Sequence, residues 1–131
     1  MNNRLLIIED NPQNIYMMHF LLEKNGFEVI EAMTGPDGIE KAVRYQPRAI
    51  LLDIQLPEMD GYAIAAELLR RPETAGIPII AVTSYAMSGD REKILAAGAT
   101  GYIEKPINPD TFVQEMMQYL PGLPNDEKEQ T

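Results

Sequence analysis

The sequence predicts an α/β fold, a doubly wound five-stranded parallel sheet, on three observations. Short apolar runs alternate five times with segments whose apolar residues recur at helical spacing. The runs at 4–8, 49–52 and 78–82 are apolar on both faces, which is typical of parallel strands covered by helices on each side. The length of 131 residues suits one domain with one core. Alternating strands and helices therefore favour a right-handed layered arrangement.

The first half of the chain carries clear boundary signals. Asn11 caps the first helix, Pro12 occupies its first turn, and Gly26 follows its end. The motif Thr-Gly-Pro-Asp at 34–37 resembles a capping box, with Asp in place of Glu, and begins the second helix. The strands predicted in this half cover residues 4–8, 27–32 and 49–52.

The second half follows the same alternation. Asp60 caps the third helix and Pro72 stops it, whereas the fourth helix begins at about Ser88. Asn108 and Pro109 are predicted to begin the last helix. The strands predicted in this half cover residues 78–82 and 101–104.

Composition excludes several classes of protein. The net charge of −9 argues against direct binding to nucleic acid, and the absence of cysteine excludes disulfides and thiolate metal sites. No apolar run is long enough to span a bilayer, and the N-terminal run is too short for a signal peptide, so a cytoplasmic location is expected. Residues 1–120 are expected to form the domain. Residues 121–131 are expected to form a polar, disordered tail, either a natural end or part of a linker.

Polar residues stand at the ends of four separate apolar runs. Glu9 and Asp10 end the first run, Asp53 ends the third and Thr83 ends the fourth, while Lys105 closely follows the fifth. The carboxyl ends of parallel strands meet at one edge of a sheet, where ligands bind in such folds. These residues are therefore expected to surround one cleft, a site for a divalent cation and a phosphoryl group.

Magnesium is the cation that this set of ligands favours. Asp10 and Asp53 are expected to supply one oxygen each, the backbone carbonyl of Gln55 a third, and Glu9 to hold a metal-bound water. Lys105 is the local positive charge that offsets repulsion among the carboxylates. For any single acid, helix capping would be the simpler interpretation. The combination of acids with a lysine favours the metal site.

One of the carboxylates is a candidate nucleophile. Asp53 is central in the predicted sheet, and an aspartate that takes a phosphoryl group forms an acyl phosphate. Mg²⁺, Lys105 and the Thr83 hydroxyl would each hold one phosphoryl oxygen. An ionised carboxylate needs no base, and no histidine stands near these motifs.

The segments at 8–11, 53–61, 82–84 and 101–106 together resemble response-regulator receiver domains, the phosphoacceptor domains of two-component signalling, of the chemotaxis-regulator kind. The resemblance runs from residue 4 to residue 120. It implies a flavodoxin-like (βα)5 fold with strand order 2-1-3-4-5. It also implies that Asp53 receives its phosphoryl group from a histidine kinase or histidine phosphotransfer protein, with Mg²⁺ held by Asp10 and Asp53.

The resemblance further implies a switch. On phosphorylation the Thr83 hydroxyl moves toward the phosphoryl group and Tyr102 turns inward. These movements change the face of the fourth helix, fifth strand and fifth helix, and this change controls a downstream partner. From its position alone, Tyr102 is an ordinary half-buried strand aromatic. Gln55 and Tyr85 occupy positions that tune access of water to the acyl phosphate, and a shielding Tyr85 predicts slow self-dephosphorylation.

Two local features are also implied by the resemblance. The bond between Lys105 and Pro106 is expected to be cis, whereas general X-Pro statistics favour trans. Docking of the phosphodonor is expected on the first helix, at the residues Asn11, Pro12, Asn14, Ile15 and Met18.

The expected function is a stand-alone phosphorylation switch rather than an enzyme, a monomer or a weak phosphorylation-dependent dimer. The main alternative is a pseudo-receiver, a binding module that works without phosphorylation. A phosphatase of the haloacid dehalogenase kind is disfavoured because Gln55 stands where a second acid is needed. A flavodoxin-like nucleotide binder is disfavoured because Glu9 and Asp10 would repel its phosphate unless a metal intervened.

Overall fold

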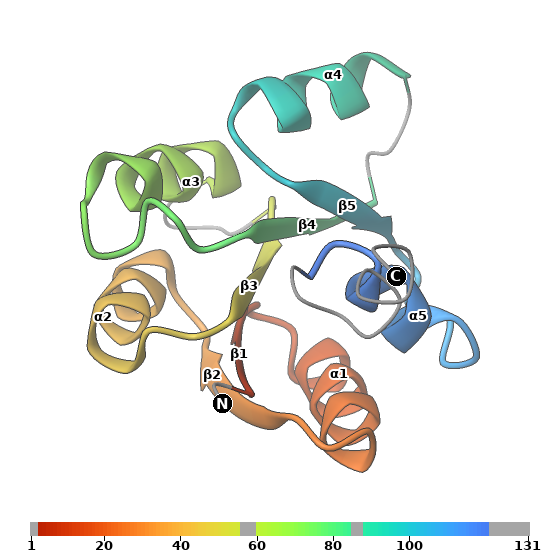
Figure 1. Ribbon diagram of the computed structural model, residues 1–131. Helices are drawn as coiled ribbons and strands as arrows, with labels where there is room; N and C mark the ends of the chain where they lie inside the picture. Colours follow the sequence, from red (N-terminus) through yellow and green to blue (C-terminus); the bar gives the residue numbers. More distant parts are fainter. Residues whose placement is uncertain (1–2, 56–59, 85–87, 121–131) are drawn as a thin grey trace, which may run out of the picture.

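The computed structural model describes residues 3–55, 60–84 and 88–120, and within them a five-stranded parallel sheet lies between helices (Figure 1). The strand order is β2-β1-β3-β4-β5, which confirms the predicted fold and topology. The strands are β1 (Arg4–Ile8), β2 (Glu28–Ala32), β3 (Ala49–Asp53), β4 (Ile79–Thr83) and β5 (Gly101–Glu104).

Helices cover both faces of the sheet. Helices α1 and α5 lie on one face and α2 and α3 on the other, while α4 lies beside β5 at the edge (Figure 1). None of the helices in the described ranges is long and apolar enough to cross a membrane. The helices are α1 (Pro12–Lys24), α2 (Gly35–Tyr45), α3 (Gly61–Arg70), α4 (Ser88–Ala96) and α5 (Phe112–Met117).

Side-chain alternation along β1 divides the core into two layers. Leu5 and Ile7 pack with α1 and α5, whereas Leu6 and Ile8 pack with α2 and α3. Successive strand residues point to opposite faces, so a strand covered on both sides must be apolar throughout. This requirement explains the continuous apolar run from which the strand was predicted.

Three of the predicted helix caps are present. Asn11 Oδ1 accepts hydrogen bonds from the backbone N–H groups of Gln13 and Asn14. Thr34 Oγ1 accepts from the backbone of Asp37 at 3.2 Å, the first half of a capping box. Asp60 Oδ1 accepts from the Ala63 N–H at 2.8 Å. Each cap satisfies backbone donors that the first helical turn leaves unpaired.

The predicted start of the last helix is wrong. Helix α5 begins at Phe112 and not at Pro109. Asn108 Oδ1 accepts from the Asp110 N–H at 2.9 Å, and the Asn108 carbonyl accepts from the Phe112 N–H at 2.9 Å, so a separate turn precedes the helix. An asparagine side chain that binds nearby backbone favours a turn as readily as a helix cap.

Candidate functional site

Three carboxylates converge where β1 and β3 end. Parallel pairing aligns Ile8 with Leu52, so Glu9 and Asp10, which follow β1, lie beside Asp53, the last residue of β3. One oxygen from each carboxylate lies within 4.8 Å of the others. Glu9 is only 1% exposed and Asp53 2%, whereas Asp10 is partly exposed. The structure therefore brings together the acids that the sequence singled out.

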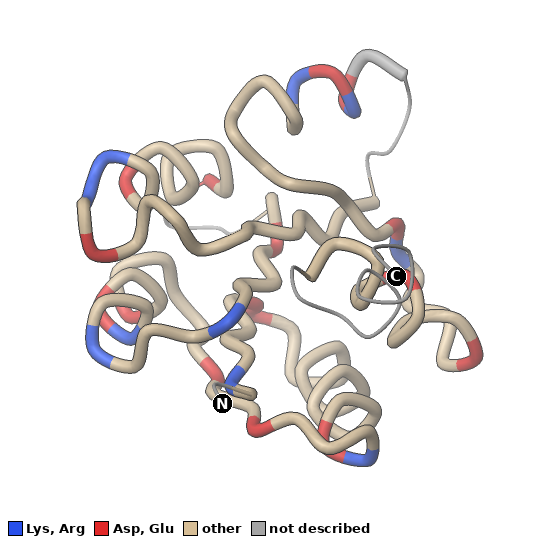
Figure 2. The backbone as a smooth tube through the Cα atoms, viewed as in Figure 1, with Lys and Arg blue, Asp and Glu red and all other residues tan. Residues whose placement is uncertain are grey.

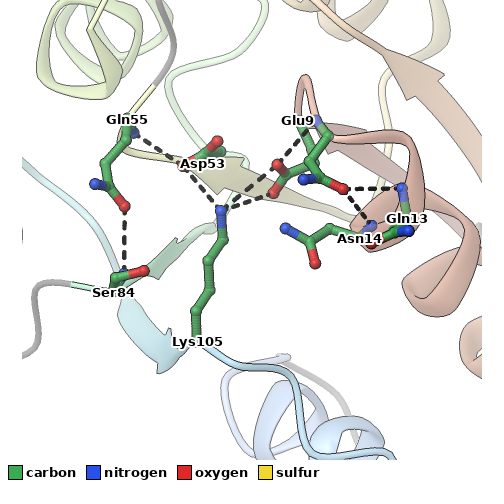
Figure 3. A network of polar contacts seen from close by, with 8 residues as sticks. Glu9, Gln13, Asn14, Asp53, Gln55, Ser84 and Lys105 are labelled. Atoms are coloured by element: carbon green, nitrogen blue, oxygen red, sulfur yellow. Dashed lines mark hydrogen bonds and ion pairs between the residues drawn. The ribbon is translucent and has the colours of Figure 1, made fainter.

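The Lys105 side chain enters this cluster from just after β5, an edge strand of the sheet. Its Nζ lies 3.2 Å from Glu9 Oε1 and 3.4 Å from Asp53 Oδ1 (Figure 3). The Lys105 backbone N–H donates to the Thr83 carbonyl at 2.8 Å, which extends the pairing of β4 and β5 by one residue. The bond from Lys105 to Pro106 is cis, as the resemblance implied and general proline statistics did not.

The charges of the cluster do not balance. Three carboxylates face one ammonium group, which leaves an excess of two negative charges if all four are ionised. Burial raises the pKa of the Glu9 carboxyl and the charge of Asp53 raises it further, although Lys105 opposes both. Such a group of acids stays ionised more easily when a cation is close.

Glu9 has one oxygen that is not fully satisfied. Oε2 accepts a hydrogen bond from the Asn11 N–H at 3.2 Å. Oε1 is buried and, among the described residues, has no hydrogen bond, although Lys105 Nζ is within ion-pair distance. A buried acceptor without a hydrogen bond beside two other carboxylates matches the oxygen ligands that Mg²⁺ prefers. The residues present therefore fit a divalent cation.

Gln55 extends the site toward the end of β4. Its backbone N–H donates to Asp53 Oδ1 at 2.9 Å, and its side-chain Oε1 accepts from the Ser84 N–H at 3.4 Å (Figure 3). The contact with Ser84 was not predicted, because Ser84 is distant from Gln55 in sequence and its place in the segment 82–84 does not indicate a partner. The side chain of Gln55 thus links the loop after β3 to the loop after β4.

The predicted switch residues lie on the two strands beyond β3. Thr83 is fully buried at the end of β4, next to β3 in the sheet. Tyr102 is half-buried in β5, and the Arg91 guanidinium lies 5.2 Å from the centre of its ring. Tyr102 therefore has the environment of a strand aromatic at the edge of the core. Tyr85 lies outside the described residues.

The first helix presents a different surface from the one expected. Ile15 and Met18 belong to the buried core, so they are not available for docking. Tyr16 is 74% exposed and Phe20 54%, and their rings stack with centroids 6.5 Å apart. Their i, i+4 spacing on the side opposite the buried positions was the signal that could have identified them.

These aromatics border an apolar groove of about 580 Å³ between α1 and the turn before α5. Its lining comes from one side of α1 and from Pro109: Pro12, Gln13, Tyr16, Met17, Phe20, Leu21 and Pro109. Elsewhere along the backbone, Lys and Arg are interspersed with Asp and Glu (Figure 2). The groove is therefore a mainly apolar surface on a charged protein.

Comparisons with known proteins agree with this geometry. The response regulator receiver domain family matches residues 5–117. The polar-differentiation response regulator DivK of Brucella ovis is 38% identical over 120 residues, covering 92% of this chain and 98% of that protein.

Two solved structures show the same fold. The chemotaxis protein CheY4 of Vibrio cholerae has a TM-score of 0.86 and 25% identity, with 92% of this chain and 100% of that chain covered. The receiver domain of the sensor histidine kinase PA1611 from Pseudomonas aeruginosa, with a magnesium ion coordinated in its active site cleft, has a TM-score of 0.82 and 33% identity. That match covers 94% of this chain and 100% of the other.

Proposed function

The chain belongs to the response regulator receiver domain family, and from this premise we propose that it is a phosphorylation-dependent signalling switch with Asp53 as the phosphoacceptor. One observation carries the proposal. Glu9, Asp10 and Asp53 gather within 4.8 Å, with Lys105 Nζ 3.4 Å from the Asp53 carboxylate. This is the set of charges that transfer of a phosphoryl group to an aspartate requires.

Each residue of the cluster would have a separate role in the transfer of the phosphoryl group. An oxygen of Asp53 attacks the phosphorus of a phosphohistidine. The P–N bond breaks, its electron pair stays on the nitrogen of the protonated imidazole, and the ring leaves neutral as the new P–O bond forms. Lys105 neutralises one phosphoryl oxygen, and the Thr83 hydroxyl donates to another.

Magnesium would be held at the acidic side of the site. Asp10 and Asp53 would each supply a carboxylate oxygen and Gln55 its backbone carbonyl, with Glu9 holding a metal-bound water. The bound ion would supply positive charge to the phosphoryl oxygens and relieve repulsion among the acids. The excess of negative charge and the buried Glu9 Oε1 support this assignment.

The phosphodonor would dock on the exposed side of α1. A donor must bring a phosphohistidine to Asp53, and α1 begins at Pro12, two residues after Asp10 in the acidic cluster. Tyr16 and Phe20 supply an aromatic anchor there, the kind of residue that dominates binding energy at interfaces. A histidine kinase or a histidine phosphotransfer protein is the partner that this geometry suits. Asn11, Pro12 and Asn14 stay candidates, whereas Ile15 and Met18 do not.

The output would pass through a different surface, the one formed by α4, β5 and α5. Movement of Thr83 toward the phosphoryl group, with rotation of Tyr102, would change the face of α4, β5 and α5 that a downstream partner reads. The slow self-dephosphorylation predicted from Tyr85 stays a prediction. The disordered tail expected at 121–131 lies outside the described residues and stays a prediction. The cytoplasmic location and the monomeric or weakly dimeric state also stay predictions.

The test is the intact mass of the protein after incubation with acetyl phosphate and Mg²⁺. The wild type is expected to gain one phosphoryl group and Asp53→Asn none. Asp110→Asn, an exposed acid in the turn before α5, is the matched control and should gain one group like the wild type. A wild type that gains no mass would overturn the switch and favour the pseudo-receiver.

A further inference from the structure

The two loops that follow β3 and β4 are joined by a side chain. Asp53 pairs with Val82 in the sheet, so Gln55 and Ser84 stand the same number of residues beyond that pair. The Gln55 carboxamide oxygen accepts the Ser84 N–H, and the Gln55 N–H donates to Asp53 Oδ1. In Figure 3 both residues lie on the side of Lys105 away from Glu9.

We propose that Gln55 is a positioning residue that occupies the Ser84 N–H before phosphorylation and yields this donor to an oxygen of the phosphoryl group on Asp53. The proposal rests on the proposed function, because it requires a phosphoryl group on Asp53. In the unphosphorylated protein, the Gln55 carboxamide oxygen would occupy the position that a phosphoryl oxygen takes after phosphorylation. The backbone carbonyl of Gln55, proposed above as a metal ligand, is not involved.

A charged phosphoryl oxygen can accept more than one contact, so the Ser84 N–H would add to the contacts from Mg²⁺, Lys105 and the Thr83 hydroxyl. A phosphoryl group on Asp53 presents three terminal oxygens that need positive charge or hydrogen-bond donors. The Ser84 N–H directly follows Thr83, which is buried at the end of β4. Its partner, Gln55, is exposed and only two residues from Asp53. The Ser84 N–H thus lies directly after the buried end of β4, and its partner is an exposed side chain that can move away.

The strength of the contact favours an exchange. At 3.4 Å the bond from the Ser84 N–H to Gln55 Oε1 is longer than usual, and both groups are neutral. A bond from the same N–H to a charged phosphoryl oxygen is shorter and roughly twice as strong. Phosphorylation would therefore displace Gln55, and loss of the phosphoryl group would let Gln55 return.

This competition predicts that removing the Gln55 acceptor strengthens binding of a phosphoryl group, or of its mimic, at Asp53. Gln55→Met keeps the length of the side chain without the acceptor, and Gln55→Ala removes both. Each variant should bind beryllium fluoride, a mimic of the phosphoryl group, about two- to fivefold more tightly than the wild type in Mg²⁺, the effect of one weak neutral hydrogen bond. Gln114→Met, the same change on an exposed part of α5, should leave the affinity unchanged.

The Ser84 amide resonance reports the contact directly. In ¹⁵N-labelled protein without the mimic, this resonance should move in Gln55→Met but not in Gln114→Met. After saturation with beryllium fluoride and Mg²⁺ it should reach the same position in the wild type and in Gln55→Met. A purely structural role for Gln55 would weaken binding of the mimic and would leave the two saturated positions different.

Two results would overturn the proposal. One is a Gln55→Met variant with unchanged or weaker affinity for beryllium fluoride, and the other is a wild-type Ser84 resonance that does not respond to the mimic. Intact mass with acetyl phosphate separates this failure from that of the proposed function. A wild type that gains a phosphoryl group while Gln55→Met behaves like Gln114→Met overturns the role of Gln55 alone. A wild type that takes up neither reagent overturns both proposals.

Discussion

Lys105 Nζ lies 3.2 Å from Glu9 Oε1, although 96 positions of the chain separate the two residues. Glu9 is almost fully buried, and the Lys105 side chain is only 14% exposed, so solvent screens this pair weakly. The ion pair is therefore part of both the fold and the candidate site.

Replacing Lys105 should destabilise the protein most when no metal is present. Lys105→Met leaves the carboxylates of Glu9, Asp10 and Asp53 without their neighbouring cation, which should lower the free energy of unfolding by about 3 kcal/mol. Mg²⁺ should then stabilise the variant more than it stabilises the wild type. Urea unfolding with and without MgCl₂ measures both effects.

Lys41→Met is the control for this change. Lys41 pairs with Asp37 on the surface of α2, and such a pair contributes less than about 1 kcal/mol. If Lys105→Met and Lys41→Met lose equal stability, or if Mg²⁺ restores the stability of neither, Lys105 does not offset the repulsion among the carboxylates.

Removing one negative charge from the cluster should have the opposite effect. Asp10→Asn and Asp53→Asn relieve repulsion and should each raise the metal-free free energy of unfolding by about 1 kcal/mol. Both variants should also lose most of the increase in melting temperature that Mg²⁺ gives the wild type. Thermal melts in EDTA and in millimolar MgCl₂ provide the comparison, with Asp110→Asn as the control. Lower melting of both variants in EDTA would contradict the repulsion argument.

His19 should make the stability of the protein depend on pH. Partial burial lowers the pKa of its imidazole, but hydrogen bonds from the ring to Glu31 and Glu23 outweigh burial and raise the pKa above 6.5. The folded state therefore binds the proton more tightly than the unfolded state. The stabilisation is complete below pH 6.5 and is lost as the pH rises through the higher pKa of the folded state.

His19→Gln should accordingly lower the free energy of unfolding by about 0.5 kcal/mol at pH 5.5. The loss should be smaller at pH 9, because the wild-type imidazole is neutral at that pH. Chemical unfolding of the wild type and the variant at the two pH values measures the difference. A cost that is equal at both pH values would show that protonated His19 does not hold α1 to β2.

Gly61 lets the helix that follows β3 return close to the phosphoacceptor strand. A Cβ added at Gly61 would lie 2.5 Å from Ile54 Cα and 3.1 Å from the Asp53 carbonyl. Gly61→Ala must therefore move backbone next to Asp53 and should cost about 1–3 kcal/mol of stability. It should also weaken Mg²⁺ binding.

Gly76→Ala is the matched control, because a Cβ there meets no atom within 4 Å. Denaturant midpoints and Mg²⁺ titrations of the two variants decide the question. Equal stability and equal Mg²⁺ affinity in both variants would mean that the close approach of Gly61 does not shape the site.

The sequence by itself determined the local features of this protein. The bounds of β1, the caps at Asn11, Thr34 and Asp60, and the strand order implied by the family motifs all appear in the structure as predicted. These features depend on side-chain period, on bonds to backbone a few residues away, or on motif spacing. All three can be read along the chain.

The tertiary structure alone decided which side chains on α1 face solvent and which atoms of the site are in contact. Whether Ile15 and Met18 or Tyr16 and Phe20 face solvent depends on what packs against α1, and only the sheet and α5 determine that. The distances from Lys105 to Glu9 and Asp53, and the bond from Ser84 to Gln55, join segments that follow different strands. Such contacts depend on strand pairing and on exact loop paths, because no local rule of spacing connects residues from separate strands.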